Sequence, residues 1–195
     1  MNSREKILAA VKKNQPSIEA LPPLDALNAI RFENVLEKFR SVLEAIGGSM
    51  VTGMGLDQVG DYVSNRFTEG SRYLTTLAAL QGVNGIDHSA KAHDLADVEV
   101  AVIGGAFAVA ENAAIWITAS SLKTRVLPFI CQHLVVVLQA EDIVHNMHEA
   151  YERIGAANYD YGVFIAGPSK TADIEQSLVL GAHGPKTMTV VLLNK

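Results

Sequence analysis

The C-terminal part of the chain concentrates small, polar and ionisable residues between two apolar runs. The first run covers residues 162–166 and the second covers residues 190–193. Polar residues between two strand-like runs are typical of a functional loop carried by a rigid scaffold. We therefore expect a site for a small organic acid or another anionic ligand here, formed by Gly167, Pro168, Ser169, Lys170, Thr171 and Gly184.

The pattern after Gly167 also predicts the start of a short helix near Ser169, with Ser169 or Thr171 as its N-cap. Backbone N–H groups at a helix start bind anions, and Lys170 adds a positive charge. Capping and the helix dipole explain the same residue types without any ligand. The sequence leaves both interpretations open.

Asp173 and Glu175 follow closely and would repel a bare phosphate group. Two neighbouring carboxylates suggest a shared proton, a partner cation, or one structural and one active group. Asp173 and Glu175 are therefore candidate catalytic residues that handle protons. Alternatively, they only complement the dipole of the predicted helix start.

His183 lies in a loop between Gly181 and Gly184, before the last apolar run. Glycines near a histidine allow a ligand to approach the backbone closely. Histidine is the side chain best suited to acid–base chemistry near neutral pH, so His183 is another candidate catalytic residue. A histidine that is hydrogen-bonded into a tight turn explains the pattern equally well.

Glu111 and Asn112 are the only polar residues in an otherwise apolar stretch, residues 104–117. A turn between two strands accounts for both, because asparagine adopts turn dihedral angles readily. A carboxylate held in low dielectric at a strand end would instead have a raised pKa and could act as a base or nucleophile. Glu111 thus joins the catalytic candidates.

The composition limits the possible functions. The 195 residues are 49% hydrophobic with a net charge of −5, which indicates one well-buried core and no basic surface for nucleic acid. The single cysteine, Cys131, excludes an internal disulfide and a four-cysteine iron–sulfur cluster built by this chain alone; we interpret it as a core residue. His145 and His148 are three residues apart, but no third ligand is identifiable, so we predict no metal site and a solvated helix face. No signal peptide or membrane span is evident, and we expect a cytoplasmic protein.

Helix and strand patterns mostly alternate along the chain. We expect helices at 31–46, 56–67, 91–96, 122–126 and 140–154, and strands at 49–52, 71–75, 98–103, 106–110, 113–118, 133–138, 161–166 and 189–193. Several of these strands are continuous apolar runs, which suit a sheet covered on both faces. We predict an α/β fold with three layers, a mainly parallel sheet and helices on both faces. The three strands between residues 98 and 118 indicate a short inserted hairpin or meander.

The N-terminal residues differ from the rest of the chain. A helix is expected over residues 3–13, followed by a segment that holds three of the six prolines. We interpret residues 1–30 as a helix and proline-containing arm, and residues 31–195 as a single α/β domain. The helix either packs on its own domain or reaches a second subunit, and the latter would permit a homo-oligomer.

Residues 164–186, which read FIAGPSKTADIEQSLVLGAHGPK, resemble the signature of the LUD domain family, in particular its lactate utilisation protein C type. Residues 110–113 resemble an earlier motif of that family that usually reads Ala-Glu-Thr-Gly. Here Asn112 and Ala113 stand where threonine and glycine are expected. The resemblance extends over about residues 30–195.

The resemblance implies a three-layer fold similar to the NagB/RpiA/CoA-transferase group. It also implies a part in the oxidation of L-lactate to pyruvate, beside two partner proteins that carry cysteine-rich iron–sulfur elements. It supplies no cofactor for this chain. CoA transferases of the wider fold group use a glutamate in a Glu-Asn-Gly context, which Glu111-Asn112 resembles.

Three functional hypotheses follow. The favoured one is a component of an L-lactate utilisation system in which Ser169, Lys170 and Thr171 bind an anionic ligand. The second is a non-catalytic assembly subunit of the same system. The third is an enzyme of the wider fold group that binds acyl-CoA or sugar phosphate.

Overall fold

The computed structural model describes residues 2–20, 28–67, 71–80, 83–85, 91–156, 159–174 and 177–193, with residues 172–174 and 177–178 described by their backbone alone. The fold is built around a six-stranded sheet in which all neighbouring strands are parallel. Its strands lie in the order β1 (Ser49–Met54), β12 (Thr187–Leu193), β7 (His133–Gln139), β4 (Val98–Gly104), β2 (Arg72–Thr75) and β3 (Asn84–Gly85). The centres of β4, β7 and β12 are buried on both faces, which explains their continuous apolar runs.

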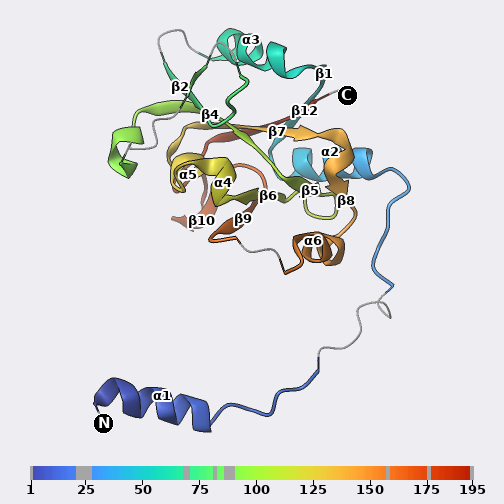
Figure 1. Cartoon of the computed structure of the whole chain (residues 1–195). Helices are drawn as coiled ribbons and strands as arrows, with labels where there is room; N and C mark the ends of the chain where they lie inside the picture. Colours follow the sequence, from blue (N-terminus) through green and yellow to red (C-terminus); the bar gives the residue numbers. More distant parts are fainter. Residues whose placement is uncertain are drawn as a thin grey trace.

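Side chains of the parallel strands alternate between two apolar layers. On one face, Val100 and Val102 of β4 pack in a cluster with α3 (Leu56–Arg66). On the other face, Ile103 belongs to a cluster that includes side chains of α2 (Val35–Ala45), α4 (Ala119–Leu122) and α5 (Leu127–Ile130). Figure 1 shows α3 above the sheet and α2, α4 and α5 below it. Each fully buried side chain of this size stabilises the fold by about 1.5–3 kcal/mol. The predicted α/β fold with helices on both faces of a parallel sheet is confirmed.

The predicted insertion forms part of a second sheet. The hairpin of β5 (Phe107–Val109) and β6 (Ile115–Thr118) is extended by β8 (Ile143–Val144) on one side and by β9 (Gly162–Ile165) on the other. Its outer face packs against α6 (Met147–Ile154) through Phe107, Trp116 and Ile154. Glycine is required at Gly162, because a Cβ there would collide with the indole ring of Trp116.

The prediction of a helix that starts near Ser169 is wrong. Residues Lys170–Ile174 form strand β10, which pairs antiparallel with β11 (Ser177–Leu180). The N–H group of Ser169 donates to the carbonyl of Pro185 (2.9 Å), and the carbonyl of Ser169 accepts from Gly181 (3.1 Å). These bonds commit the Ser169 backbone to the following loop, so no helix N-terminus is present to bind an anion.

Three other predicted helical segments are shorter, displaced or 3₁₀ in type. The segment 140–154 contains a 3₁₀ turn, η3 (Ala140–Asp142), then β8, and becomes helical only after the N-cap Asn146. In the segment 122–126, Leu122 ends α4 and residues 123–126 separate α4 from α5 instead of forming a helix. The segment 91–96 is the 3₁₀ helix η2 (Ala92–Leu95).

Helix α1 (Ser3–Lys13) forms as predicted and starts with a reciprocal cap. Asn2 Oδ1 accepts from the Glu5 N–H, and Glu5 Oε2 accepts from the Asn2 N–H, both at 2.9 Å. Its apolar face is uncovered, because Ile7, Leu8 and Val11 are 51–63% exposed. Packing of this helix on its own domain is therefore not observed.

No helix in the described part of the chain is long and apolar enough to cross a bilayer. Among the same residues, no group of three or more histidine, cysteine, aspartate or glutamate side chains is placed to hold a metal ion.

A cluster of polar side chains lies where the amino ends of the parallel strands meet, a region that we call the amino edge of the sheet. His133, the first residue of β7, has its Nδ1 atom 2.7 Å from the hydroxyl of Thr187 and its Nε2 atom 3.4 Å from the carboxylate of Glu99. The ring of His133 also lies 4.8 Å from the ring of Phe67, measured between centroids. Burial lowers the pKa of His133 from its ordinary value of 6.5, and Glu99 only partly offsets this effect.

We expect protonation of His133 to destabilise the fold. Because the pKa of His133 is lowered in the folded state, the unfolded chain binds more protons than the folded chain just below pH 6.5. The contribution of neutral His133 to the free energy of unfolding is therefore fully present above pH 6.5, and it is lost as the pH falls through the folded-state pKa. The melting temperature of His133→Gln should therefore fall less between pH 7.5 and pH 5.5 than that of the wild type. His148→Gln, a change at an exposed position of α6, should retain the wild-type slope. A steeper slope in His133→Gln would show that the Glu99 contact outweighs burial.

Candidate functional site

Six of the residues predicted from the C-terminal motif line one hollow of about 280 Å³. They come from two segments of the chain: Gly167, Pro168, Ser169 and Lys170 follow β9, and His183 and Gly184 precede β12. The remaining lining residues belong to α5, β9 and the adjoining loops, and are Pro128, Phe129, Phe164, Ile165, Ala166 and Pro185. We refer to this hollow as the C-terminal hollow.

The two motif segments are tied together through their backbones. The loop before β12 makes two backbone hydrogen bonds with Ser169, through Gly181 and Pro185. In the same loop, the Lys186 N–H donates to the carbonyl of Gln132 (2.8 Å), next to the first residue of β7. A Cβ on Gly184 would lie 3.1 Å from the Cβ of Ser169, so only a very small residue permits this approach. The geometry of the hollow is thus set by main-chain contacts at the amino edge of the parallel sheet.

The same segment packs on the end of helix α2. Gly167 has φ +72°, and a Cβ there would lie 3.0 Å from Ile46 Cγ1, so glycine satisfies both the dihedral angle and the packing. Lys170 Nζ lies 3.1 Å from the position that a Cβ on Gly47 would take, directly after α2. An ammonium group beside a helix C-terminus is favourable, which gives Lys170 a structural contact as well as a position at the hollow.

The lining of the hollow is chemically mixed. Ser169 is half-buried and offers a hydroxyl group, while Lys170 and His183 are exposed and offer a cation and an imidazole. Phe129 and Phe164 contribute apolar ring surface. A small organic acid matches this combination, because its carboxylate can contact the polar groups while its carbon skeleton lies on the rings.

The remaining residues of the predicted motif are not part of this lining. Thr171 lies in β10, opposite Val179 of β11, and Asp173 lies in the same strand. The side chain of Asp173 and all of Glu175 lie outside the described residues. The proposed catalytic roles of Asp173 and Glu175 stay predictions.

Glu111 occupies the turn between β5 and β6 and is exposed, so the low-dielectric environment expected for it is not found. Its Oε2 atom accepts from the N–H of Met147 (3.0 Å), the first residue of α6. Its own N–H donates to the carbonyl of His145 (3.1 Å). The structure therefore gives Glu111 a capping contact, and Glu111 is not among the described residues that line the C-terminal hollow. Its catalytic role stays a prediction.

Asn112 and Ala113 follow Glu111 in this turn and differ from the motif that the segment resembles. Their local structure shows how the turn accommodates both residues. Ala113 is fully buried and has φ +57°, a left-handed conformation that costs a non-glycine residue about 1–2 kcal/mol. Glycine, which stands here in the motif that the segment resembles, adopts that conformation without the cost. Asn112 supports the turn, because its Oδ1 atom accepts from the Ala114 N–H (3.0 Å).

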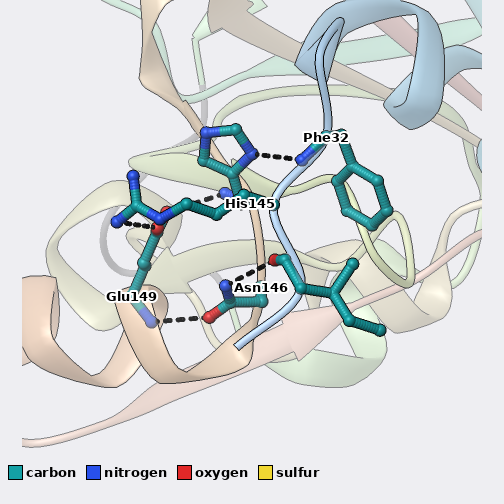
Figure 2. Close-up of polar contacts among 6 residues, drawn as sticks. Phe32, His145, Asn146 and Glu149 are labelled. Carbon is teal, nitrogen blue, oxygen red and sulfur yellow. Dashed lines mark hydrogen bonds and ion pairs between the residues drawn. The ribbon is translucent and has the colours of Figure 1, made fainter. Parts of the chain in front are cut away.

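A cluster of polar contacts fixes the chain segment 30–32 to the start of α6 (Figure 2). Asn146 Nδ2 donates to the carbonyl of Ile30 (3.0 Å), and the N–H of Phe32 donates to His145 Nδ1 (3.0 Å). Arg31 Nη2 lies 2.7 Å from Glu149 Oε1. We call this group of contacts the arm clasp.

The sequence did not predict the arm clasp. His145 was assigned to a solvated helix face, yet it precedes α6 and is an acceptor for a residue 113 positions earlier in the chain. The only local signal was Asn146, whose Oδ1 caps α6 by accepting from the Glu149 N–H (3.0 Å).

Cys131 lies between α5 and β7 and is 1% exposed. Burial raises the pKa of its thiol to about 12, so the nucleophilic thiolate is strongly disfavoured. The position agrees with the interpretation of Cys131 as a core residue.

The comparison with protein families gives one match over nearly the whole chain. The pattern of the LUD domain family matches residues 5–193.

Two curated relatives illustrate the similarity in sequence. A "Lactate utilization protein C" of Exiguobacterium sp. is 30% identical over 105 residues, which cover 51% of this chain and 45% of the relative. A protein of the same name from Geobacillus sp. is 29% identical over 116 residues, covering 55% and 48% respectively. The matched part therefore spans about half the length of these relatives.

One solved structure is similar in fold. It is a DUF162 family protein from Deinococcus radiodurans, with a TM-score of 0.58 and 15% sequence identity. The match covers 82% of this chain and 96% of the solved one, so the architecture of the two proteins is shared.

The substitution Asn146→Ala tests the arm clasp. Asn146 is 2% exposed and its side chain makes both the helix cap and the bond to Ile30, so the loss should be about 2–3 kcal/mol in the free energy of unfolding. The matched control is Asn34→Ala, since Asn34 caps α2 in the same way, with Oδ1 accepting from the Glu37 N–H (3.0 Å); its loss should be about 1 kcal/mol. Chemical denaturation measures both. Equal losses would show that the Ile30 contact adds nothing.

The second test concerns Cys131. In the folded protein the thiol should resist Ellman's reagent, because it is buried and its pKa is about 12. In denaturant the reagent should report one thiol per chain, the number in the sequence. Rapid reaction of the folded protein would contradict the assignment of Cys131 to the core.

Proposed function

Because the chain belongs to the LUD domain family, we propose that it is a component of an L-lactate utilisation system that binds a small organic acid in the C-terminal hollow. Support comes from the curated relatives that are named lactate utilization protein C, although this chain covers about half of their length. The observation that carries the proposal is the meeting of both motif segments, through Ser169, Lys170 and His183, around one hollow.

In this proposal Ser169 and Lys170 bind the carboxylate of the ligand. A hydroxyl and an ammonium group together supply charge-assisted hydrogen bonds, each of which contributes about 1.5–3 kcal/mol. Phe129 and Phe164 cover the carbon skeleton of the ligand. The volume of about 280 Å³ suits an acid of a few carbon atoms.

His183 is the residue proposed to handle a proton. Oxidation of L-lactate to pyruvate breaks the O–H bond and the C2–H bond. The hydroxyl proton goes to a base, and the C2 hydrogen leaves with both electrons to an acceptor supplied by a partner protein. His183 lies at the hollow and is exposed, so it can accept that proton and pass it to water. We propose that the electrons leave through an iron–sulfur partner protein, since one cysteine cannot supply the four thiolates of a typical cluster.

A second candidate function is that of an assembly subunit without catalysis. The observation in its favour is helix α1, whose apolar side chains Ile7, Leu8 and Val11 remain exposed. An amphipathic helix with an uncovered face is a common element of protein–protein contacts. In that case residues 1–30 form the contact with partner proteins, and residues 31–195 form the single domain that they attach.

Binding of L-lactate and pyruvate to the purified chain tests the site. Calorimetric titration should give a saturable signal for at least one of the two acids. Lys170→Gln should weaken binding about tenfold or more, because it removes a charge-assisted hydrogen bond. Lys91→Gln removes the same charge at the exposed start of η2, outside the hollow, and should leave binding unchanged. Equal effects of the two variants would show that only net charge matters.

Growth on lactate separates the two candidate functions. In a strain that lacks this gene, wild-type protein should restore growth, and His183→Ala should fail to restore it although the protein folds and still binds the acid. If His183→Ala and Lys170→Gln restore growth fully, while deletion of residues 2–14 abolishes it, the assembly function is correct.

A further inference from the structure

A second hollow, of about 230 Å³, lies at the carboxyl ends of the parallel strands, at the other end of the strands from the C-terminal hollow. Its lining includes Thr75 and Thr76 at the carboxyl end of β2, Gly85 at the end of β3, and Lys123 after α4. It shares no lining residue with the C-terminal hollow. We call it the carboxyl-edge hollow.

The position of this hollow favours a ligand. In open parallel sheets, ligands bind outside the carboxyl ends of the strands, at the point where successive connections leave in different directions. The chain after β2 continues to the edge strand β3, whereas the chain after the neighbouring strand β4 enters the second sheet at β5. The carboxyl-edge hollow lies beside this divergence, whereas the C-terminal hollow lies at the amino edge.

The two threonines at the end of β2 differ in their hydrogen bonding. The Thr75 hydroxyl donates to the carbonyl of Val102 (3.0 Å) and accepts from the Leu77 N–H (3.0 Å), so it holds the turn in place. The Thr76 hydroxyl oxygen is buried and has no hydrogen-bond partner among the described residues. A buried hydroxyl without a partner is unfavourable, and rotation of the Thr76 side chain toward the hollow would let a ligand atom satisfy it.

Lys123 is held at the hollow by an unusual backbone. Its dihedral angles are φ +61° and ψ −51°, and the Thr124 N–H donates across it to the carbonyl of Leu122 (2.5 Å). This γ-turn with positive φ is rare and strained for a residue that is not glycine. The flanking Leu122 and Leu127 are fully buried and keep the turn in this form. Strain of this kind is found most often at ligand-binding positions.

We propose that the carboxyl-edge hollow binds a short aliphatic carboxylate. The carboxylate pairs with the ammonium group of Lys123 and accepts from the Thr76 hydroxyl. Its hydrocarbon part lies on Leu77, Leu80 and Val83, which line the same hollow. A volume of about 230 Å³ accommodates such an acid. This inference does not rest on the proposed function, since the two hollows are separate.

The test uses the full chain with labelled Leu and Val methyl groups, observed by NMR during titration with isovalerate. The methyl signals of Leu77, Leu80 and Val83 should shift saturably. Isovaleramide has the same shape without the charge and should bind at least tenfold more weakly. If inorganic phosphate shifts the same signals and isovalerate does not, the site takes a phosphoryl group and the assignment to an aliphatic acid is overturned.

Variants identify the contributing residues. Lys123→Gln should weaken isovalerate binding at least tenfold, and Lys123→Arg should restore it to within about threefold. Arg125→Gln removes the same charge two residues away and should have no effect, because the Arg125 guanidinium lies over the ring of Tyr161 and does not line the hollow. Equal weakening by Arg125→Gln would overturn the proposal.

Thr76→Val separates binding from stability. Valine has nearly the shape of threonine, so this variant should bind isovalerate at least fivefold more weakly while its melting temperature stays the same or rises. A clear fall in melting temperature, with binding retained, would show that the Thr76 hydroxyl has a structural partner and overturn its assignment to the ligand. Loss of isovalerate binding together with retained lactate binding at the C-terminal hollow would leave the proposed function intact.

Discussion

Burial of the parallel sheet on both faces is the constraint on which the rest of the structure depends. Neither face of the parallel sheet can remain exposed to water, because β4, β7 and β12 carry apolar side chains on both faces. One face is covered by α3, and the other requires α2, α4, α5 and the second sheet together. The second sheet in turn needs α6 to cover its outer face. The start of α6 is where Glu111 and the segment 30–32 attach.

Because the strands are parallel, the polar side chains at their amino ends and those at their carboxyl ends form two separate groups. The loops that precede β7 and β12 meet at the amino edge, where the C-terminal hollow and the His133 group lie. The carboxyl ends of β2 and β3 lie at the carboxyl edge, together with Thr76 and Lys123. The C-terminal motif is rich in glycine and proline because its two segments must approach each other closely, as Gly184 and Ser169 do. The motif therefore has a structural task in addition to any ligand that it holds.

Continuous apolar runs such as 134–138 predicted the buried parallel strands, because burial on both faces removes every polar position from a strand. The clustering of Gly167–Lys170 with His183 was also foreseeable, since both segments adjoin strands of the scaffold. The helix near Ser169 was not, because capping residues and hairpin residues overlap in type, and contacts with Gly181 and Pro185 decide between the two. The arm clasp and the Lys123 turn depend on contacts or strain that no local pattern records.

The place of β12 in the sheet has a consequence for the synthesis of the chain. β12 lies between β1 and β7, so Ser49 pairs with Thr189, 140 positions later in the chain, and β1 has no other neighbour among the described strands of the sheet. A chain still attached to the ribosome can pair β7 with β4, but it leaves β1 without a partner until β12 emerges. The sheet can therefore be completed only after β12 has left the ribosome, and the edge of β7 stays open to chaperones until then.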